Sequence, residues 1–236
     1  MKVRLKFTKE GEMKFIGHLD LMRCFQKVIR RSGIDIKFSE GLSPHMVMSF
    51  ASPLSVGLTS LGEYVDMELV TPVSSAEGVR RLNEQMPAGI RALSLKQIPE
   101  GRANGAMALV AAAEYTVRFR EGKAPAGGWE DKVPAFLAQE TISAVKETKK
   151  RETTVDIRPL IYRMEAAGGE VKLRLAGGSE ANLKPELLMD TFVRWLGEEP
   201  QPFSLLICRT ELLAKAGGEQ DESFVPLEDL GEDIVL

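Results

Sequence analysis

The stretches MKVRLKFTKE at residues 1–10 and HLDLMRCFQKVIRR at residues 18–31 decide the fold. In the first, Val3, Leu5 and Phe7 alternate with basic side chains, and this two-residue period predicts a strand with one buried face. In the second, apolar residues recur every three or four positions, which predicts an amphipathic helix. The chain therefore begins with a strand and a helix that packs on it.

The pattern continues outward from this pair and completes one structural unit. Alternating apolar residues predict further strands at 34–38, 64–70 and 90–98. A helix is expected from Ser74 or Ser75, either of which can cap it, to about residue 86. The resulting order, β-α-β-β-α-β, is that of a ferredoxin-like unit.

The second half of the chain repeats this order after a connector at residues 99–108. The expected elements are a strand from 115, a short helix near 129–137, strands at 141–148, 155–164 and 170–176, a helix at 184–196 and a strand at 203–209. We therefore predict an α+β protein of two tandem ferredoxin-like (βαββαβ) units with antiparallel sheets, at residues 1–105 and 106–215, and an acidic tail at 216–236. Two unrelated α+β units would give a similar pattern.

Composition excludes several classes of protein. The 236 residues are 44% hydrophobic and 28% charged, which is typical of a folded globular chain. Cys24 and Cys208 are too few for a disulfide framework or an iron–sulfur ligand set. No apolar run is long enough to span a membrane, and no signal peptide is recognisable, so we expect a cytoplasmic protein without membrane association.

Charge is distributed unevenly along the chain. Residues 216–236 carry seven acidic side chains and no Lys or Arg, so the other 215 residues have a net charge of +4, although the whole chain has −3. The first 37 residues hold ten Lys or Arg against four acids. A basic surface of this kind suits a polyanionic partner, although an uneven distribution is also common without any function.

Basic side chains gather in two places. Arg23, Lys27 and Arg30 follow helical spacing and form a stripe on one side of the predicted helix. The second group comprises a predicted hairpin tip and the strand after it: Lys149, Lys150, Arg151 and Arg158. Both groups suit contacts to phosphates, while the second also fits a solubility feature or, for Arg158, pairing with a nearby carboxylate.

Both histidines of the chain lie in its most distinctive region. His18 begins the predicted helix, and His45 lies in a loop whose motif residues are Ser39, Glu40, Gly41, Ser43, Pro44 and His45. The two rings could act as acid and base in phosphodiester cleavage, or bind a metal together with Asp20 and Glu40. Alternatively, His18 caps the helix and His45 orders the loop. Because no known metal-ligand spacing is present, no metal site is predicted.

Several separated motifs together resemble the bacterial radical SAM-associated (radical-SAM-linked) protein family, a domain of unknown function. They are FIGHLDLMRCF (15–25), FSEGLSPH (38–45), VMSFASPLSVGL (47–58), EYVDMEL (63–69), VDIRPLI (155–161) and NLKPELLM (182–189). The resemblance implies a radical SAM protein as the partner. It also implies that the iron–sulfur cluster and SAM belong to that partner, with no cofactor bound by this chain.

The sequence is compatible with three functions. The favoured one is a binding protein that presents an RNA, such as tRNA or ribosomal RNA, to the radical SAM enzyme. The second is a stand-alone RNA-processing enzyme that uses His18 and His45. The third is a protein–protein adaptor that docks through the acidic tail or through residues 46–48. Because the chain has no P-loop, no hydrolase motif and no cluster-binding motif, we favour binding over catalysis.

Overall fold

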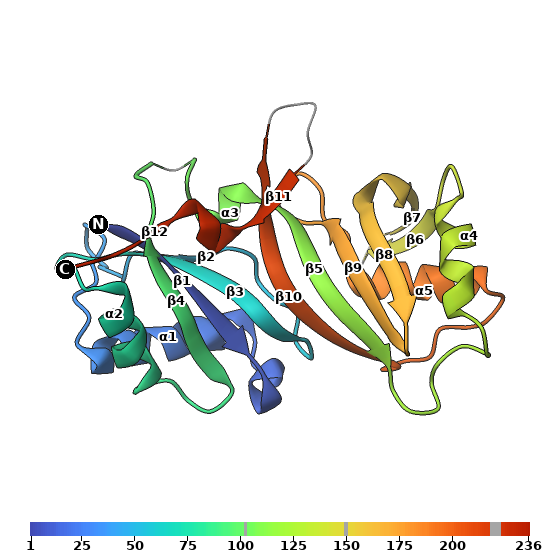
Figure 1. Cartoon of the computed structure of the whole chain (residues 1–236). Coiled ribbons are helices and arrows are strands. Elements are labelled where there is room, and N and C mark those ends of the chain that lie inside the picture. The colour runs from blue at the N-terminus through green and yellow to red at the C-terminus, as the bar shows by residue number, and fades with distance from the viewer. Residues whose placement is uncertain (102, 149–150, 218–222) are drawn as a thin grey trace. The chain divides into compact units, whose positions relative to one another are not determined.

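The computed structural model describes residues 1–101, 103–148, 151–217 and 223–236 (Figure 1). Ten of its strands belong to one sheet and two form a separate pair, with few helices, so the fold is α+β as predicted. Contacts between Cα atoms divide the chain into two compact units. Unit 1 comprises Met1–Ala111 and Glu211–Leu236, and unit 2 comprises Ala112–Thr210.

Unit 1 combines the N-terminal elements with the C-terminal ones. Its elements are β1 (Lys2–Lys9), the 3-10 helix η1 (Gly11–Phe15), α1 (His18–Ser32), β2 (Met48–Phe50), β3 (Thr59–Glu68), α2 (Ser75–Asn83), β4 (Ile90–Gln97), α3 (Ala106–Leu109), β11 (Ser223–Pro226), the 3-10 helix η4 (Leu227–Leu230) and β12 (Glu232–Asp233). Two long strands, β5 (Val110–Phe119) and β10 (Leu205–Ala216), begin in one unit and end in the other.

Strand β1 lies at the centre of the sheet in unit 1. It pairs antiparallel with β3 on one side and with β4 on the other, and β2 pairs antiparallel with β3. Val3, Leu5 and Phe7 of β1 are fully buried in a core that also contains Phe25 of α1 and Leu82 of α2. The alternation in residues 3–7 therefore directs one face of β1 toward the helices, as its sequence predicts.

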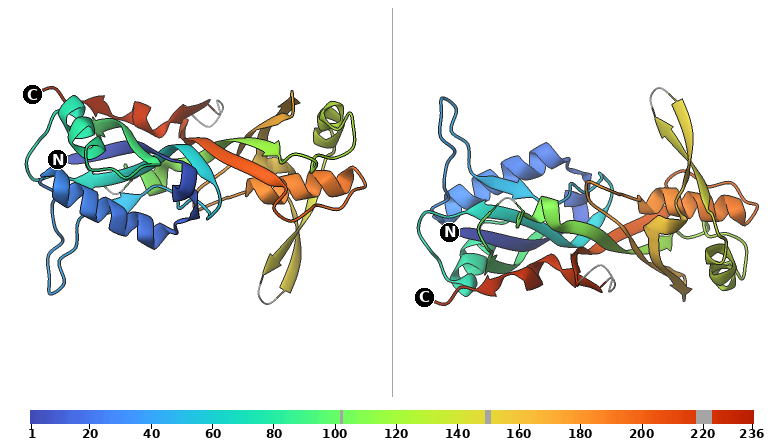
Figure 2. Two further views of the ribbon diagram at one scale, coloured as in Figure 1. Left: turned by 90° about the horizontal axis from the view of Figure 1, so that it is seen from below. Right: turned by 90° about the horizontal axis from the view of Figure 1, so that it is seen from above.

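The last residues of the chain cover the opposite face of this sheet. We call residues 223–236 the C-terminal strap; it pairs with β10 through β11 and with β4 through β12. Figure 2 shows α1 on one side of the sheet and the strap, in red, on the other. Leu227 of the strap is fully buried. Glu211–Leu236 thus belongs to unit 1, whereas the predicted organisation placed residues 211–215 in the second unit and residues 216–236 in a separate tail.

Unit 2 has its own strands and helices. Besides parts of β5 and β10, it contains the 3-10 helix η2 (Glu130–Lys132), α4 (Val133–Leu137), β6 (Ser143–Thr148), β7 (Arg151–Asp156), the 3-10 helix η3 (Arg158–Leu160), β8 (Ile161–Ala167), β9 (Glu170–Ala176) and α5 (Pro185–Trp195). Strand β9 pairs antiparallel with β5 and with β8, and β6 pairs antiparallel with β7. The aromatic side chains of Trp129, Phe136 and Phe192 pack together in its core.

Two predicted strands differ from the structure. Residues 34–38 form only isolated bridges, Ile36 with Leu69 and Phe38 with Met46, so the expected strand there is wrong. The expected strand at 155–164 is divided, because η3 with Pro159 separates β7 from β8. Proline has no backbone N–H to give to a ladder, which favours an interruption of the strand at this position.

The helices of unit 1 and unit 2 are short. Within the ranges that the structure describes, none of them is long and apolar enough to cross a membrane.

Candidate nucleic-acid interface

Helix α1 presents four cations to solvent. Gly17 precedes the helix, and Gly33 ends it in the left-handed conformation, at a φ of 67° that glycine adopts without strain. The buried positions of α1, directed at the sheet, are Leu21, Phe25, Val28 and Ile29. The exposed basic positions, which we call the α1 basic face, are Arg23, Lys27, Arg30 and Arg31. Sequence reasoning identified three of them and omitted Arg31, which follows Arg30 directly.

The charge of the α1 basic face is hardly neutralised. Arg23 lies 3.4 Å from Asp20, and both side chains are exposed, so this pair contributes little. Among the residues described, Lys27, Arg30 and Arg31 form no ion pair. Four cations against one carboxylate give this helix surface a net positive charge that is available to a polyanion.

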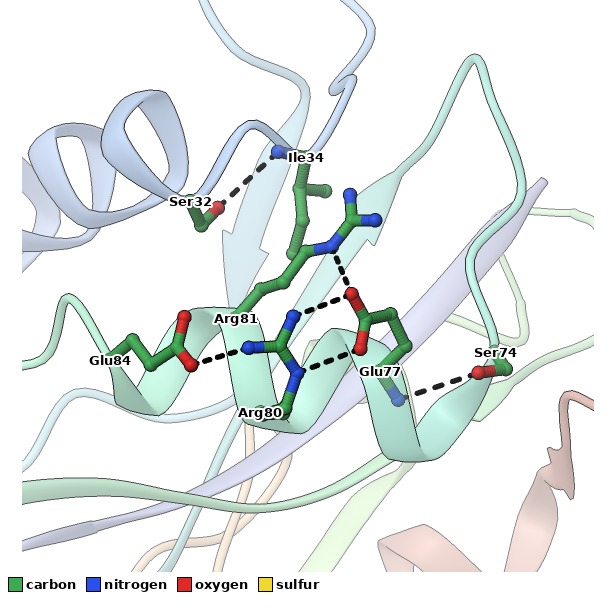
Figure 3. A network of polar contacts seen from close by, with 7 residues as sticks. All are labelled: Ser32, Ile34, Ser74, Glu77, Arg80, Arg81 and Glu84. Atoms are coloured by element: carbon green, nitrogen blue, oxygen red, sulfur yellow. Dashed lines mark hydrogen bonds and ion pairs between the residues drawn. The ribbon is translucent and has the colours of Figure 1, made fainter.

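Helix α2 shows the opposite arrangement (Figure 3). Glu77 accepts hydrogen bonds from Arg80 and from Arg81, and Arg80 also pairs with Glu84. The hydrogen bond from Arg80 is the largest of the effects that lower the pKa of Glu77 to about 2. The arginines of α2 are therefore neutralised by carboxylates on the same helix, which makes α2 a natural control for α1.

His18 is the first residue of α1 and is half-buried. Its ring meets the ring of Phe50 edge to face, at 5.3 Å between centroids and an interplanar angle of 85°. Phe50 also packs against Phe7 and Phe25. This contact joins the start of α1 to the aromatic part of the unit 1 core.

His45 closes the motif loop by local contacts. Its Nδ1 lies 2.8 Å from Ser39 Oγ, its backbone N–H donates to the same oxygen, and its carbonyl accepts from the Ser39 N–H at 2.8 Å. Within the loop, Glu40, Gly41, Ser43 and Pro44 are exposed. Figure 2 shows this loop, in light blue, extending away from the sheet beside the end of α1 that is opposite His18. These contacts join His45 to Ser39 at the other end of the motif loop.

The structure does not bring the two histidines together through any contact between described residues. His18 contacts Phe50, whereas His45 lies five residues earlier in a stretch that includes β2. An extended chain of five residues spans about 16 Å. Among the described residues there is also no group of three or more His, Cys, Asp or Glu side chains able to hold a metal ion.

Only part of the second basic group, Lys149, Lys150, Arg151 and Arg158, lies within the described residues. Lys149 and Lys150 lie outside the described residues, and Arg151 is the first residue of β7. Arg158 is half-buried, and its Nε donates to the Leu137 carbonyl at 2.9 Å, while its backbone N–H donates to Asp156. Arg158 therefore ties η3 to α4 and is less available to phosphates than the α1 basic face.

Residues 46–48 offer little as a docking surface. Met46 is only 4% exposed, and Met48 packs against the same core. In the strap, Leu227 is buried and Glu228 is paired with Lys6. Leu227 and Glu228 are thus engaged inside unit 1, whereas Asp229, Glu232 and Asp233 of the same described segment are exposed.

Unit 2 contains a cavity that sequence reasoning missed. It has a volume of about 540 Å³ and lies between α5 and the region of β6. Its lining includes Phe136, Gln139, Thr141, Arg194 and Trp195. The lining comes from two stretches, 136–145 and 191–195, which are about 50 positions apart, so no local sequence pattern could reveal it.

Comparison with known proteins gives a family but no activity. A family model described as an uncharacterised protein conserved in bacteria, DUF2344, matches residues 2–185. No curated protein matches. Among solved structures, the chain is similar to one in a Cbf5–Nop10–Gar1 complex, with 14% identity and a TM-score of 0.45, over 89% of this chain and 48% of that one. The chain thus spans about half the length of that relative, and a likeness at this level gives no basis for a shared function.

Proposed function

Because the chain belongs to DUF2344, a family of uncharacterised proteins conserved in bacteria, we propose its function from its own geometry: it binds RNA through the α1 basic face. The observation that carries this proposal is the contrast between the two helices of unit 1. The cations of α1 are exposed and nearly unpaired, whereas those of α2 are neutralised on the helix itself. The unpaired cations of α1 therefore remain available to a polyanion, and those of α2 do not.

Binding by this face is electrostatic. Arg23 and Arg30 lie seven residues apart, which corresponds to about 10 Å along a helix. Lysine and arginine side chains at this spacing can contact successive phosphates and release the counterions that surround them. Contacts of this kind position the nucleic acid without reading its sequence.

We further propose that the RNA is presented to a radical SAM enzyme. The resemblance of the motifs quoted above to radical-SAM-associated proteins supports this partner. In this arrangement the iron–sulfur cluster and SAM belong to the enzyme, and the present chain holds the substrate.

We also propose that both units are ferredoxin-like. The strand order β4-β1-β3-β2 of unit 1 supports this assignment, as does the order β10-β5-β9-β8 in the other half of the chain. In both cases the first and third strands of a β-α-β-β-α-β order are neighbours, as that arrangement requires.

The test measures the affinity of the purified protein for a fluorescein-labelled, mixed-sequence, single-stranded RNA by fluorescence anisotropy over a salt series. The variant is Arg23→Ala/Lys27→Ala/Arg30→Ala, and the matched control is Arg80→Ala/Arg81→Ala on α2. Alanine is the best helix former, so none of these exposed changes should unfold a helix. Losing three phosphate contacts should reduce the slope of log affinity against log salt by about 2.

The α2 variant should keep the affinity and the slope of the unchanged protein. If the α1 variant also keeps both, the α1 basic face is not the RNA-binding surface. Losses in proportion to the charges removed, three on α1 and two on α2, would mean that binding responds to net charge alone, and this result would also contradict the proposal.

A further inference from the structure

The cavity in unit 2 has the size and chemistry of a ligand site. Its volume of about 540 Å³ falls within the range of about 300–1,000 Å³ that is usual for small-molecule sites. One part of its wall is apolar, with Phe136, Ala144 and Val145, and another part carries polar side chains. The lining residues lie on α4, on β6, on the segment between them and on α5, the elements labelled in Figure 1.

Trp195 gives the cavity an exposed aromatic wall. It is 39% exposed, whereas Trp129, the other tryptophan of the chain, is 7% exposed and lies in the core. Phe136 and Phe192 pack against Trp195 at centroid distances of 5.5 and 6.2 Å. The indole is therefore supported by the core while part of it remains open to a planar ligand.

The polar groups of the cavity include one fixed amide and several groups without a hydrogen-bond partner. Gln139 donates from Nε2 to the Phe136 carbonyl at 2.8 Å, which fixes the amide. Within the described part of the chain, Gln139 Oε1 and the hydroxyls of Thr141 and Ser143 have no hydrogen-bond partner. Arg194 forms no ion pair there, although the charge of Asp190, one turn earlier on α5, interacts with it. The site thus offers an acceptor, two hydroxyls and one cation beside an aromatic ring.

We propose that this cavity binds an unstacked nucleobase of a single-stranded RNA, with the base against Trp195, its edge at Gln139, and a phosphate near Arg194. A nucleotide matches this set because it combines a π face, in-plane donors and acceptors, and an anionic phosphate. The inference rests on the proposed RNA-binding function and specifies the form of the RNA at this contact. A base in a duplex has its faces covered by stacked neighbours and its edge by the paired base, so it could not offer both to Trp195 and Gln139.

The experiment uses the indole N–H signals of the ¹⁵N-labelled full-length protein. The chain has two tryptophans, so the spectrum should contain two indole resonances, and the Trp195→Leu variant identifies one of them. The probes are AMP, GMP, CMP and UMP, with ribose 5-phosphate as the base-free control. At least one nucleoside monophosphate should shift the Trp195 resonance saturably and leave the Trp129 resonance in place.

Variants separate the contributions of the ring and the charge. Arg194→Gln should weaken nucleotide binding about tenfold, as expected for a lost charged contact. Arg118→Gln, a change to another exposed arginine of unit 2, should leave the affinity unchanged. In Trp195→Leu the unchanged Trp129 resonance reports that the core is folded, and nucleotide binding measured by calorimetry should fall at least about fivefold.

Two results would overturn the inference: no nucleotide moves the Trp195 resonance, or ribose 5-phosphate moves it equally. Failure of the cavity proposal can be distinguished from failure of RNA binding by the α1 basic face. If the α1 variant keeps its RNA affinity and salt slope while nucleotides still shift Trp195, the cavity stands and the α1 basic face does not. If nucleotides have no effect while the α1 variant loses RNA affinity, the cavity proposal alone fails.

Discussion

Arg4 shows how one side chain can join segments that are far apart in sequence. It is 1% exposed, and its guanidinium forms two hydrogen bonds with Asp66, Nε to Oδ1 at 2.8 Å and Nη2 to Oδ2 at 3.0 Å. It also donates to the carbonyls of Asn104 and Leu227. A buried cation needs such partners because its transfer from water is costly. Arg4 therefore links β1 to β3, to the segment before α3 and to the strap.

We predict that Arg4→Met lowers the free energy of unfolding by about 3–5 kcal/mol, because it leaves the Asp66 carboxylate without its cation. Urea denaturation followed by circular dichroism would measure the loss. The double variant Arg4→Met/Asp66→Leu removes both charges and should recover most of the stability. A single variant that costs less than about 1 kcal/mol would show that the pair contributes no more than an exposed one.

At the scale of elements, the strap is held to the sheet by a polar cluster. Lys6 Nζ lies 2.6 Å from carboxylate oxygens of both Glu211 and Glu228, and Ser94 Oγ donates to Glu228. Tyr64 OH donates to Glu211. Burial is the larger cause, and the negative charge of Glu211 the next, of a pKa of Tyr64 that lies well above its usual range. Glu228 thus connects η4 of the strap to β1 and β4.

The pKa of Glu228 predicts how this connection responds to acid. Burial, the largest single effect, raises the pKa, but the hydrogen bonds from Lys6 and Ser94 and the nearby positive charges together lower it below the ordinary value of 4.5. A depressed carboxyl pKa contributes stability that is present above pH 4.5 and is lost as the pH falls below that value. Strap docking should therefore weaken in acid.

We predict that Glu228→Gln is less stable than the unchanged protein near neutral pH and that the difference shrinks as the pH falls through 4.5. Thermal unfolding between about pH 6 and about pH 3 would follow this convergence. Glu232→Gln on β12 is a suitable control, because its side chain is exposed and forms no ion pair within the described ranges. Parallel curves for Glu228→Gln and the unchanged protein would contradict the prediction.

At the scale of the whole molecule, unit 1 needs both ends of the chain. Unit 2, Ala112–Thr210, is inserted in sequence between the two parts of unit 1. Contacts such as Lys6 with Glu211 and Lys6 with Glu228 join residues separated by 205 and 222 positions. Closing such long separations costs chain entropy that must be offset by burial and hydrogen bonding, so unit 1 is completed only when the C-terminal residues are in place.

We predict that deleting residues 223–236 destabilises unit 1, because Arg4 and Lys6 lose partners and the sheet face is exposed. Faster amide hydrogen exchange in β1 and β4 would report the effect. Deleting only Val235 and Leu236, which are exposed, is the matched control and should leave exchange unchanged. If the longer deletion leaves β1 as protected as the control does, the strap is dispensable for unit 1.

Much of the candidate site was readable from local periodicity. The positions of Arg23, Lys27 and Arg30 on the solvent side of α1 follow from the 3.6-residue period of the apolar positions, and the structure has that helix at His18–Ser32. Joint catalysis by His18 and His45 stays a prediction. The sequence did not indicate that His18 contacts Phe50 or that His45 contacts Ser39. Both contacts depend on how the chain returns to itself.

The sequence by itself determined the α+β class, the central strand β1, the helices α1 and α5, and the basic stripe of α1. Each of these depends on a period of two or of about three and a half residues within one segment. Only the tertiary structure decided the strap contacts, the burial of Arg4, and the cavity beside Trp195. These features require residues that are distant in the chain to meet, and local pattern does not encode which distant partners satisfy a buried charge or leave an aromatic ring uncovered.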